Sequence, residues 1–188
     1  DEEGFVHEEE LEAALTSDTV LVSIMFANNE IGTIQPIKRL AELAHRQGVL
    51  FHTDAVQATG ALHINVKELG VDMLSLSGHK FYGPKGIGAL YIRNGMQTEP
   101  FMTGGEQERT KRGGTTNVPA IVGMAAALKA ACRDMDKDNA YFAALRDKFV
   151  RRVLDEIPEV LFNGAKDMRF RLPNNCLLYT SPSPRDTR

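Results

Sequence analysis

The chain has 188 residues, of which 43% are hydrophobic and 25% charged, an ordinary composition for a globular protein with a buried core. Its net charge of −3 offers no basic field to nucleic acid or anionic membranes. No apolar run approaches the length of about 20 residues that a membrane span needs. We therefore expect no nucleic-acid partner and no membrane partner.

The two cysteines, Cys132 and Cys176, have neither a disulfide framework nor metal-ligand spacing. A reducing, cytoplasmic location is the default expectation for such a chain. The sequence opens on DEEGFVHEEE, without a methionine and within a predicted loop, so we expect a fragment of a longer protein.

Predicted helices and strands alternate along the chain. Amphipathic spacing indicates helices, and continuous apolar runs rich in β-branched residues indicate buried strands. In chain order we predict a helix in 7–16, a strand at 19–26, a helix at 37–48, a strand at 49–55, a short helix at 66–70, strands at 71–77 and 87–93, and two long helices at 119–135 and 139–157. This order predicts an α/β fold with a mostly parallel sheet flanked by helices.

Polar side chains follow three of these strands directly. ANNEIG (27–32) follows the first strand, DAVQ (54–57) the second and GHK (78–80) the third. In sheets of this kind, ligands bind beyond the carboxyl ends of the strands. We therefore expect amide, carboxylate, imidazole and ammonium groups to converge on one edge.

These groups suit pyridoxal phosphate. Lys80 can form a Schiff base with a carbonyl group, and Asp54 can keep a pyridine nitrogen protonated. The amides of Gln57 and Asn29 can donate to a phenolic oxygen. Ser77 and His79 can donate to a phosphate. Together with Lys80, they are candidate cofactor ligands.

Four motifs together resemble the cysteine desulfurases, the NifS-like branch of the class-V aminotransferase family of fold-type I pyridoxal-phosphate enzymes. They are NNEIGTIQPI, HTDAVQATG, SGHKFYGPKGIGALY and GGEQERTKRGGTTNVPAIVG, and the resemblance runs from about residue 3 to 175. It implies part of the large cofactor-binding domain at 1–136 and the start of the small C-terminal domain at 137–175.

The resemblance also implies a role for each candidate residue. Lys80 corresponds to the family's Schiff-base lysine, Asp54 to its pyridine-nitrogen aspartate and Gln57 to its ring-oxygen glutamine. Ser77 and His79 correspond to phosphate ligands, and Asn29 to an asparagine near ring and substrate. Thr115 corresponds to a threonine that reaches the phosphate site of the neighbouring subunit, which implies a homodimer.

The implied activity is conversion of L-cysteine to L-alanine, with the sulfur passing to an enzyme cysteine and then to a sulfur acceptor or iron–sulfur scaffold protein. The loop with the family's catalytic cysteine and its substrate-binding arginine are missing from this sequence, so we expect the fragment itself to be inactive. Selenocysteine lyase, on the same scaffold, is an alternative. A non-catalytic fragment or binding module of the same fold is another.

Structural explanations compete for several single residues. His79–Lys80 could be a surface pair, and Asp54 and the Asn28–Asn29 pair could be turn residues. GPKGIG lacks the spacing of a nucleotide-binding loop. We expect Arg109 and Arg112 to order the loop that presents Thr115, and Cys132 to be a buried apolar residue. His45, His52 and His63 are expected to pack or lie at the surface, with a minor supporting role open to His52 because it shares a strand face with Asp54.

The tail has a different origin in our interpretation. Residues 176–186, CLLYTSPSPRD, match the translation of a transposase adapter used in DNA sequencing libraries over eleven consecutive residues. We therefore predict that 176–188 is adapter read-through and not a domain, that Cys176 is not the catalytic cysteine, and that the tail has few contacts and no regular structure.

Overall fold

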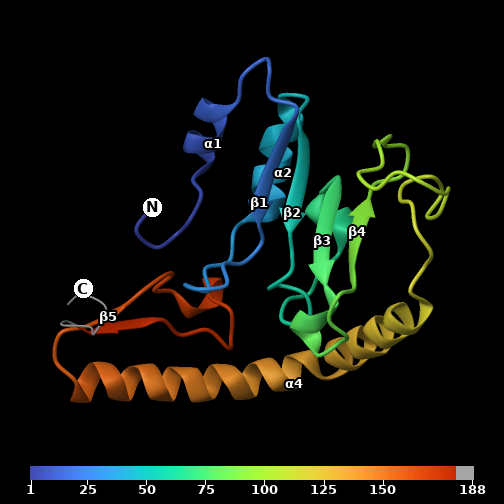
Figure 1. Ribbon diagram of the computed structural model, residues 1–188. Coiled ribbons are helices and arrows are strands. Elements are labelled where there is room, and N and C mark those ends of the chain that lie inside the picture. The colour runs from blue at the N-terminus through green and yellow to red at the C-terminus, as the bar shows by residue number, and fades with distance from the viewer. Residues whose placement is uncertain (181–188) are drawn as a thin grey trace, which may run out of the picture.

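A four-stranded sheet forms the centre of the protein in a computed structural model, which describes residues 1–180. The strands β1 (Leu21–Met25), β2 (Leu50–Asp54), β3 (Met73–Ser77) and β4 (Gly88–Ile92) lie in that order. The first three are parallel, and β4 runs antiparallel to β3 (Figure 1). The predicted mostly parallel α/β sheet is confirmed, and each strand begins and ends within two residues of its predicted bounds.

The connections explain this mixture of directions. Helix α2 (Ile37–Arg46) links β1 to β2, and the short helix α3 (Val66–Leu69) links β2 to β3, so both pairs can be parallel. Only residues 78–87 connect β3 to β4. This connection is too short for a crossover, so the two strands pair antiparallel.

One face of the sheet carries the hydrophobic core. Alternation along β1, β2 and β3 directs Val22, Phe51 and Leu74 to this face, where α2 contributes Leu40 and Ala44. Phe51 and Leu40 have no exposed surface, and each such burial contributes about 1.5–3 kcal/mol. Helix α1 (Glu8–Ala14) packs outside α2. The opposite face, which carries Asp54, is only partly buried.

The long helix α4 (Val118–Glu156) differs from the prediction. The two helices expected at 119–135 and 139–157 are one continuous helix of 39 residues, about 58 Å long. The intervening Asp-Lys-Asp segment contains no glycine or proline that would stop a helix. The side-chain amide of Asn139 also donates to the Ala61 carbonyl at 2.7 Å and holds the middle of α4 against the main body.

A second, two-stranded sheet lies over the C-terminal half of α4 (Figure 1). It consists of β5 (Val160–Phe162) and β6 (Leu178–Thr180), which are antiparallel, and the turn η2 (Met168–Phe170) lies between them. The predicted division of the chain at 136/137 falls inside α4. That division stays a prediction.

The prediction that the tail has no regular structure is wrong for residues 178–180, because these form β6. Tyrosine and threonine favour strands, and backbone pairing with the free edge of β5 does not require a matched sequence. Leu177 and Leu178 are half-buried and Tyr179 is exposed, so none of them belongs to the core. Residues 181–188 lie outside the described residues, and the adapter origin of 176–188 stays a hypothesis.

A buried carboxylate joins three strands at the end of the sheet opposite the predicted site. Asp72, which has no exposed surface, accepts a hydrogen bond from the Phe51 amide at 2.7 Å. It also lies 2.8 Å from His45 Nε2 and 2.8 Å from an Arg93 guanidinium nitrogen. Because a buried carboxylate is costly without partners, these contacts define where α2, β2 and the end of β4 meet.

We predict that Asp72→Asn lowers the free energy of unfolding by about 2 kcal/mol, because the His45 and Arg93 contacts lose their charge. Urea unfolding of the chain measures this loss. Asp136→Asn is the matched control, because Asp136 also contacts a histidine, His63 at 2.7 Å, but with 82% of its side chain exposed. Equal stability losses in the two variants would contradict the importance of the buried cluster.

Candidate active site

The predicted residues of β2 and β3 meet at the carboxyl edge of the sheet. Asp54 is the last residue of β2 and lies opposite Ser75 in the parallel register. Ser77 is the last residue of β3, and the single 3-10 turn η1 (Gly78–Phe81) follows it and carries His79 and Lys80. The fold therefore brings Asp54, Gln57, Ser77, His79 and Lys80 to one edge, as predicted.

The turn that carries Lys80 is anchored from behind. Phe81 is buried, whereas His79 and Lys80 are exposed. The Gly83 amide donates to the Gly78 carbonyl at 2.9 Å, and a Cβ atom at Gly83 would lie only 2.8 Å from that oxygen. Glycine is therefore required at position 83. Helix α4 packs behind the turn, so that Lys80 projects from a rigid support.

Two short contacts orient the polar groups. Ser77 Oγ lies 2.8 Å from His79 Nδ1, which joins the two predicted phosphate ligands. Asp54 Oδ1 accepts a hydrogen bond from the Val56 amide at 2.8 Å, in the turn that leads to Gln57. This bond fixes the carboxylate at the strand end and leaves its other oxygen without a hydrogen bond to any residue in 1–180.

The loop after β1 holds Asn29 at the same edge. The Asn28 side chain accepts hydrogen bonds from the Glu30 and Ile31 amides at 2.8 and 3.0 Å, so Asn28 is a turn residue, which was one of the roles open to the Asn28–Asn29 pair. Asn29 is exposed. The side-chain amide of Asn175 donates to the Glu30 carbonyl at 2.8 Å, so the segment before β6 supports this loop.

Thr115 is not brought together with the other candidates. It is exposed in the loop before α4, and no hydrogen bond within residues 1–180 joins it to the other six. Arg112 donates to the Gly113 carbonyl at 3.1 Å and to Thr116 Oγ1 at 3.5 Å. These contacts on either side of Thr115 support the expected ordering role of Arg112. No side-chain hydrogen bond or ion pair of Arg109 occurs within residues 1–180, so its ordering role stays a prediction.

A polar row that the sequence pattern did not reveal crosses the partly exposed face of the sheet. Ser23 Oγ lies 2.7 Å from His52 Nδ1, and Ser75 Oγ lies 2.8 Å from His52 Nε2. Burial lowers the pKa of His52, and the Asp54 carboxylate partly opposes this by raising it. In the sequence, the one indication of this row was that His52 lies two residues before Asp54 and so shares its strand face.

The two cysteines differ in exposure. Cys132 is exposed, so the prediction that it is buried is wrong. It lies at an apolar hollow of about 350 Å³ between α4 and the β3–β4 pair, beside Leu128 and Met135, and is only partly covered there. Burial raises the pKa of the half-buried Cys176 thiol, and nearby Arg171 and Arg146 lower it only in part. A thiol with a raised pKa is a poorer nucleophile at neutral pH, and that Cys176 is not catalytic stays a prediction.

We predict that iodoacetamide alkylates Cys132 before Cys176 at neutral pH, because alkylation requires an accessible thiolate. Raising the pH should speed up labelling of Cys176, whose pKa is raised. Mass spectrometry of timed samples separates the two sites, with Cys132→Ser and Cys176→Ser as controls. Faster labelling of Cys176 at neutral pH would contradict this assignment.

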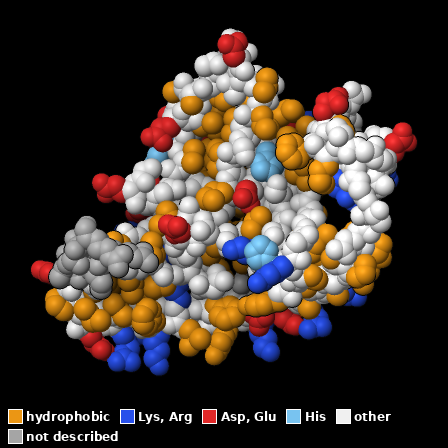
Figure 2. All heavy atoms as spheres, in the orientation of Figure 1, with side chains coloured by type: hydrophobic (Ala, Val, Ile, Leu, Met, Phe, Trp, Pro, Cys, Tyr) orange, Lys and Arg blue, Asp and Glu red, His pale blue; other side chains and the backbone are white. Residues whose placement is uncertain are grey.

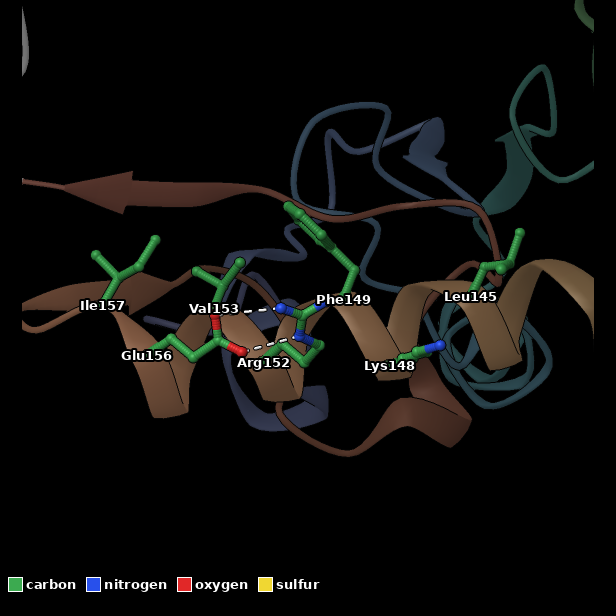
Figure 3. A pocket seen from close by; sticks show the side chains of 7 residues that line it. All are labelled: Leu145, Lys148, Phe149, Arg152, Val153, Glu156 and Ile157. Carbon is green, nitrogen blue, oxygen red and sulfur yellow. Dashed lines mark hydrogen bonds and ion pairs between the residues drawn. The ribbon is translucent and has the colours of Figure 1, made fainter.

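A second hollow, of about 430 Å³, lies along the C-terminal half of α4 and contains none of the predicted site residues. Figure 3 shows its lining on successive turns of that helix, with Arg152 paired to Glu156 beside Phe149. Figure 2 shows hydrophobic side chains gathered along the same helix. Lys148 is the only amine in the lining of this hollow, and no histidine, serine or aspartate lies there beside it, so the strand edge remains the better candidate.

Residues 1–180 contain neither a metal-binding cluster nor a helix that could span a membrane. No group of three or more histidine, cysteine, aspartate or glutamate side chains is placed to hold a metal ion. No helix there combines the length and the apolar character that a bilayer crossing requires.

The sequence matches the family Aminotransferase class-V over residues 1–175. The chain belongs to the class-V aminotransferase family. A cysteine desulfurase IscS from Clostridium botulinum (strain Hall) is 53% identical over 175 residues, which cover 93% of this chain and 44% of that relative. The resemblance to cysteine desulfurases is thereby confirmed, and the match ends at Asn175, one residue before the predicted read-through at 176–188.

Solved structures agree. A NifS-like protein superposes with a TM-score of 0.92 at 39% identity, covering 100% of this chain and 51% of that one. A structure described as SspA in complex with cysteine is 44% identical, with a TM-score of 0.67, and covers 69% of this chain and 38% of that one. The fold is therefore that of the NifS-like class-V aminotransferases, and the chain spans about half the length of the relatives it matches.

The residues at the strand edge fit the cofactor of this family. Class-V aminotransferases use pyridoxal phosphate, which needs an amine for its aldehyde, an acid for its ring nitrogen and donors for its phosphate. The exposed amine of Lys80, the free oxygen of Asp54 and the Ser77–His79 pair supply these three kinds of group.

Proposed function

We propose that this chain is part of a longer pyridoxal-phosphate-dependent cysteine desulfurase. The observation that carries the proposal is the placement of Lys80 and Asp54 at the ends of adjacent strands, with the Ser77–His79 contact between them in the chain. The 53% identity to a cysteine desulfurase supports it. In the complete protein the substrate would be L-cysteine and the product L-alanine, with the sulfur passed to an acceptor protein.

Each residue has a defined task in this proposal. Lys80 would hold the cofactor covalently and Asp54 would keep its ring nitrogen protonated, while Gln57 and Asn29 would bind the ring oxygen. Ser77 and His79 would hold the phosphate. When bound, pyridoxal phosphate supplies an electron sink for the pair released at the substrate Cα. Lys80 and Asp54 come from one rigid edge, so this chain's contribution is to position the reacting groups.

The sulfur-accepting thiol has no good candidate among the two cysteines of this chain. Cys132 is accessible, but it lies on α4 at an apolar hollow whose lining includes none of the strand-edge candidates, and the pKa of Cys176 is raised by burial. We therefore propose that the 188-residue chain alone releases no sulfide from cysteine. A homodimer in which Thr115 completes the partner's phosphate site is part of the same proposal. Its support is the exposure of Thr115 on a loop that Arg112 orders.

A selenocysteine lyase on the same scaffold remains the second candidate, because the groups at the strand edge serve either substrate. The relative whose structure is described in complex with cysteine favours the sulfur substrate. Comparing L-cysteine with L-selenocysteine as substrates of the complete protein separates the two activities. Activity on selenocysteine alone would replace the desulfurase proposal by the lyase.

We predict that borohydride reduction of the cofactor-loaded protein leaves a pyridoxyl group on Lys80, because its amine follows β3 directly at the ligand edge. Peptide mapping by mass spectrometry locates the label. Lys85 is the internal control, since it is an exposed lysine of the same loop. A label on Lys85 in place of Lys80 would contradict the assignment of Lys80 as the cofactor-binding lysine.

We predict that Asp54→Asn keeps the Lys80 label but lowers alanine formation from L-cysteine by about a hundredfold in the complete protein, as expected when a site loses one preorganised electrostatic contact. Asp136→Asn, which removes an exposed carboxylate on α4, is the control and should retain full activity. An Asp54→Asn protein with unchanged turnover would show that this carboxylate does not act on the ring.

A further inference from the structure

The Ser23–His52–Ser75 row leads to a residue that the proposed function does not yet use. The three side chains come from three adjacent strands, and each ring nitrogen of His52 lies within 2.8 Å of a serine oxygen. Ser23 lies opposite His52 in the register of β1 and β2, and Ser75 lies opposite Asp54 in the register of β2 and β3. The row thus ends beside the candidate cofactor-binding carboxylate.

His52 and Asp54 share one face of β2 because side chains alternate along a strand. Two residues along a strand span about 6.6 Å, so a charge on the imidazole would act directly on the carboxylate. A cationic His52 would partly neutralise Asp54. It would also repel a protonated ring nitrogen bound to the free oxygen of Asp54.

The two serines allow His52 to stay uncharged without losing a contact. A neutral imidazole has one N–H donor and one acceptor nitrogen, and a serine hydroxyl can serve as partner to either. The serine that donates to the acceptor nitrogen stabilises the neutral form alone. Burial also favours the neutral form and lowers the pKa of His52, although Asp54 acts in the opposite direction.

We propose that His52 is a positioning residue for Asp54: the Ser23–His52–Ser75 row holds the imidazole fixed and uncharged, so that the Asp54 carboxylate keeps its full charge for the cofactor's ring nitrogen. This inference rests on the proposed function for the identity of the ligand, although the state of His52 itself does not. If the row served only to connect the strands, the affinity for the cofactor would not depend on the charge of residue 52.

The first test measures the charge of His52 in the isotope-labelled chain by NMR of the histidine rings, with His52→Asn to assign the signal. We expect a neutral ring at neutral pH. Ser23→Ala and Ser75→Ala should shift the ring towards a mixture of tautomers, and whichever serine donates to the ring should raise the pKa when removed. Asp54→Asn should lower it further, because Asp54 raises it. A charged His52 at neutral pH, or no response to Asp54→Asn, would overturn the inference.

The second test measures pyridoxal phosphate affinity by absorbance titration of the complete protein. His52→Asn leaves residue 52 uncharged and able to bond both serines, so affinity should stay within about twofold. His52→Lys places a fixed cation beside Asp54 and should weaken binding about tenfold. His63→Lys is the matched control, because His63 is an exposed histidine paired with Asp136 on α4 and lies outside the row. Circular dichroism verifies that each variant is folded.

These outcomes separate the inference from the proposed function. Equal affinities of folded His52→Asn and His52→Lys proteins would reject the positioning role, while a pyridoxyl label on Lys80 would still support the enzyme. Absence of any label on Lys80 in the unsubstituted protein would reject the proposed function and, with it, the role of His52 towards the cofactor. The NMR result would then report only on the His52–Asp54 pair.

Discussion

The parallel pairing of β1, β2 and β3 is the constraint on which the candidate site depends. Parallel strands in register end at the same edge of a sheet, and this places Asp54 and the Lys80 turn beside each other although 25 residues separate them in the chain. A slip of β2 by one residue would turn Asp54 towards the face that Phe51 and Thr53 occupy in the core. The same apolar packing that stabilises the sheet therefore also sets the direction of the Asp54 carboxylate.

Polar contacts secure this register at two levels of the sheet. At the amino ends, buried Asp72 contacts the start of β2, α2 and the residue after β4. Nearer the carboxyl ends, His52 joins serines on both neighbouring strands. Hydrogen bonds require a defined distance and angle, whereas apolar contacts tolerate small shifts. These polar clusters therefore fix the strand register more strictly than apolar packing alone.

Helix α4 connects the site to the rest of the described chain. Its N-terminal half packs behind the Lys80 turn, and its C-terminal half lies against the β5–β6 sheet (Figure 1). The segment between those strands returns to the loop of Asn29, where Asn175 holds the Glu30 carbonyl. The loops after β1 and β3 are thus supported by different parts of one continuous stretch, 118–175, which limits their movement relative to each other.

The sequence by itself was sufficient for the strand bounds, for the mostly parallel sheet and for the placement of Asp54, Ser77 and Lys80 at strand ends. These features depend on local patterns, namely apolar runs that end in polar residues, and on short connections. Thr115 shows the limit of prediction from sequence. The motif that contains Thr115 was recognised, but the fold of the single chain does not bring Thr115 to the carboxyl edge of the sheet.

Only the tertiary structure decided the continuity of α4, the exposure of Cys132, the pairing of 178–180 with β5 and the Ser23–His52–Ser75 row. Each of these depends on which distant segment lies alongside. The charged stretch 136–138 lies inside one helix that Asn139 anchors to the Ala61 carbonyl, and His52 has a fixed orientation because two serines, 52 residues apart, flank it. Such contacts between residues far apart leave no periodic signal in the sequence, because they arise only when the strands have paired.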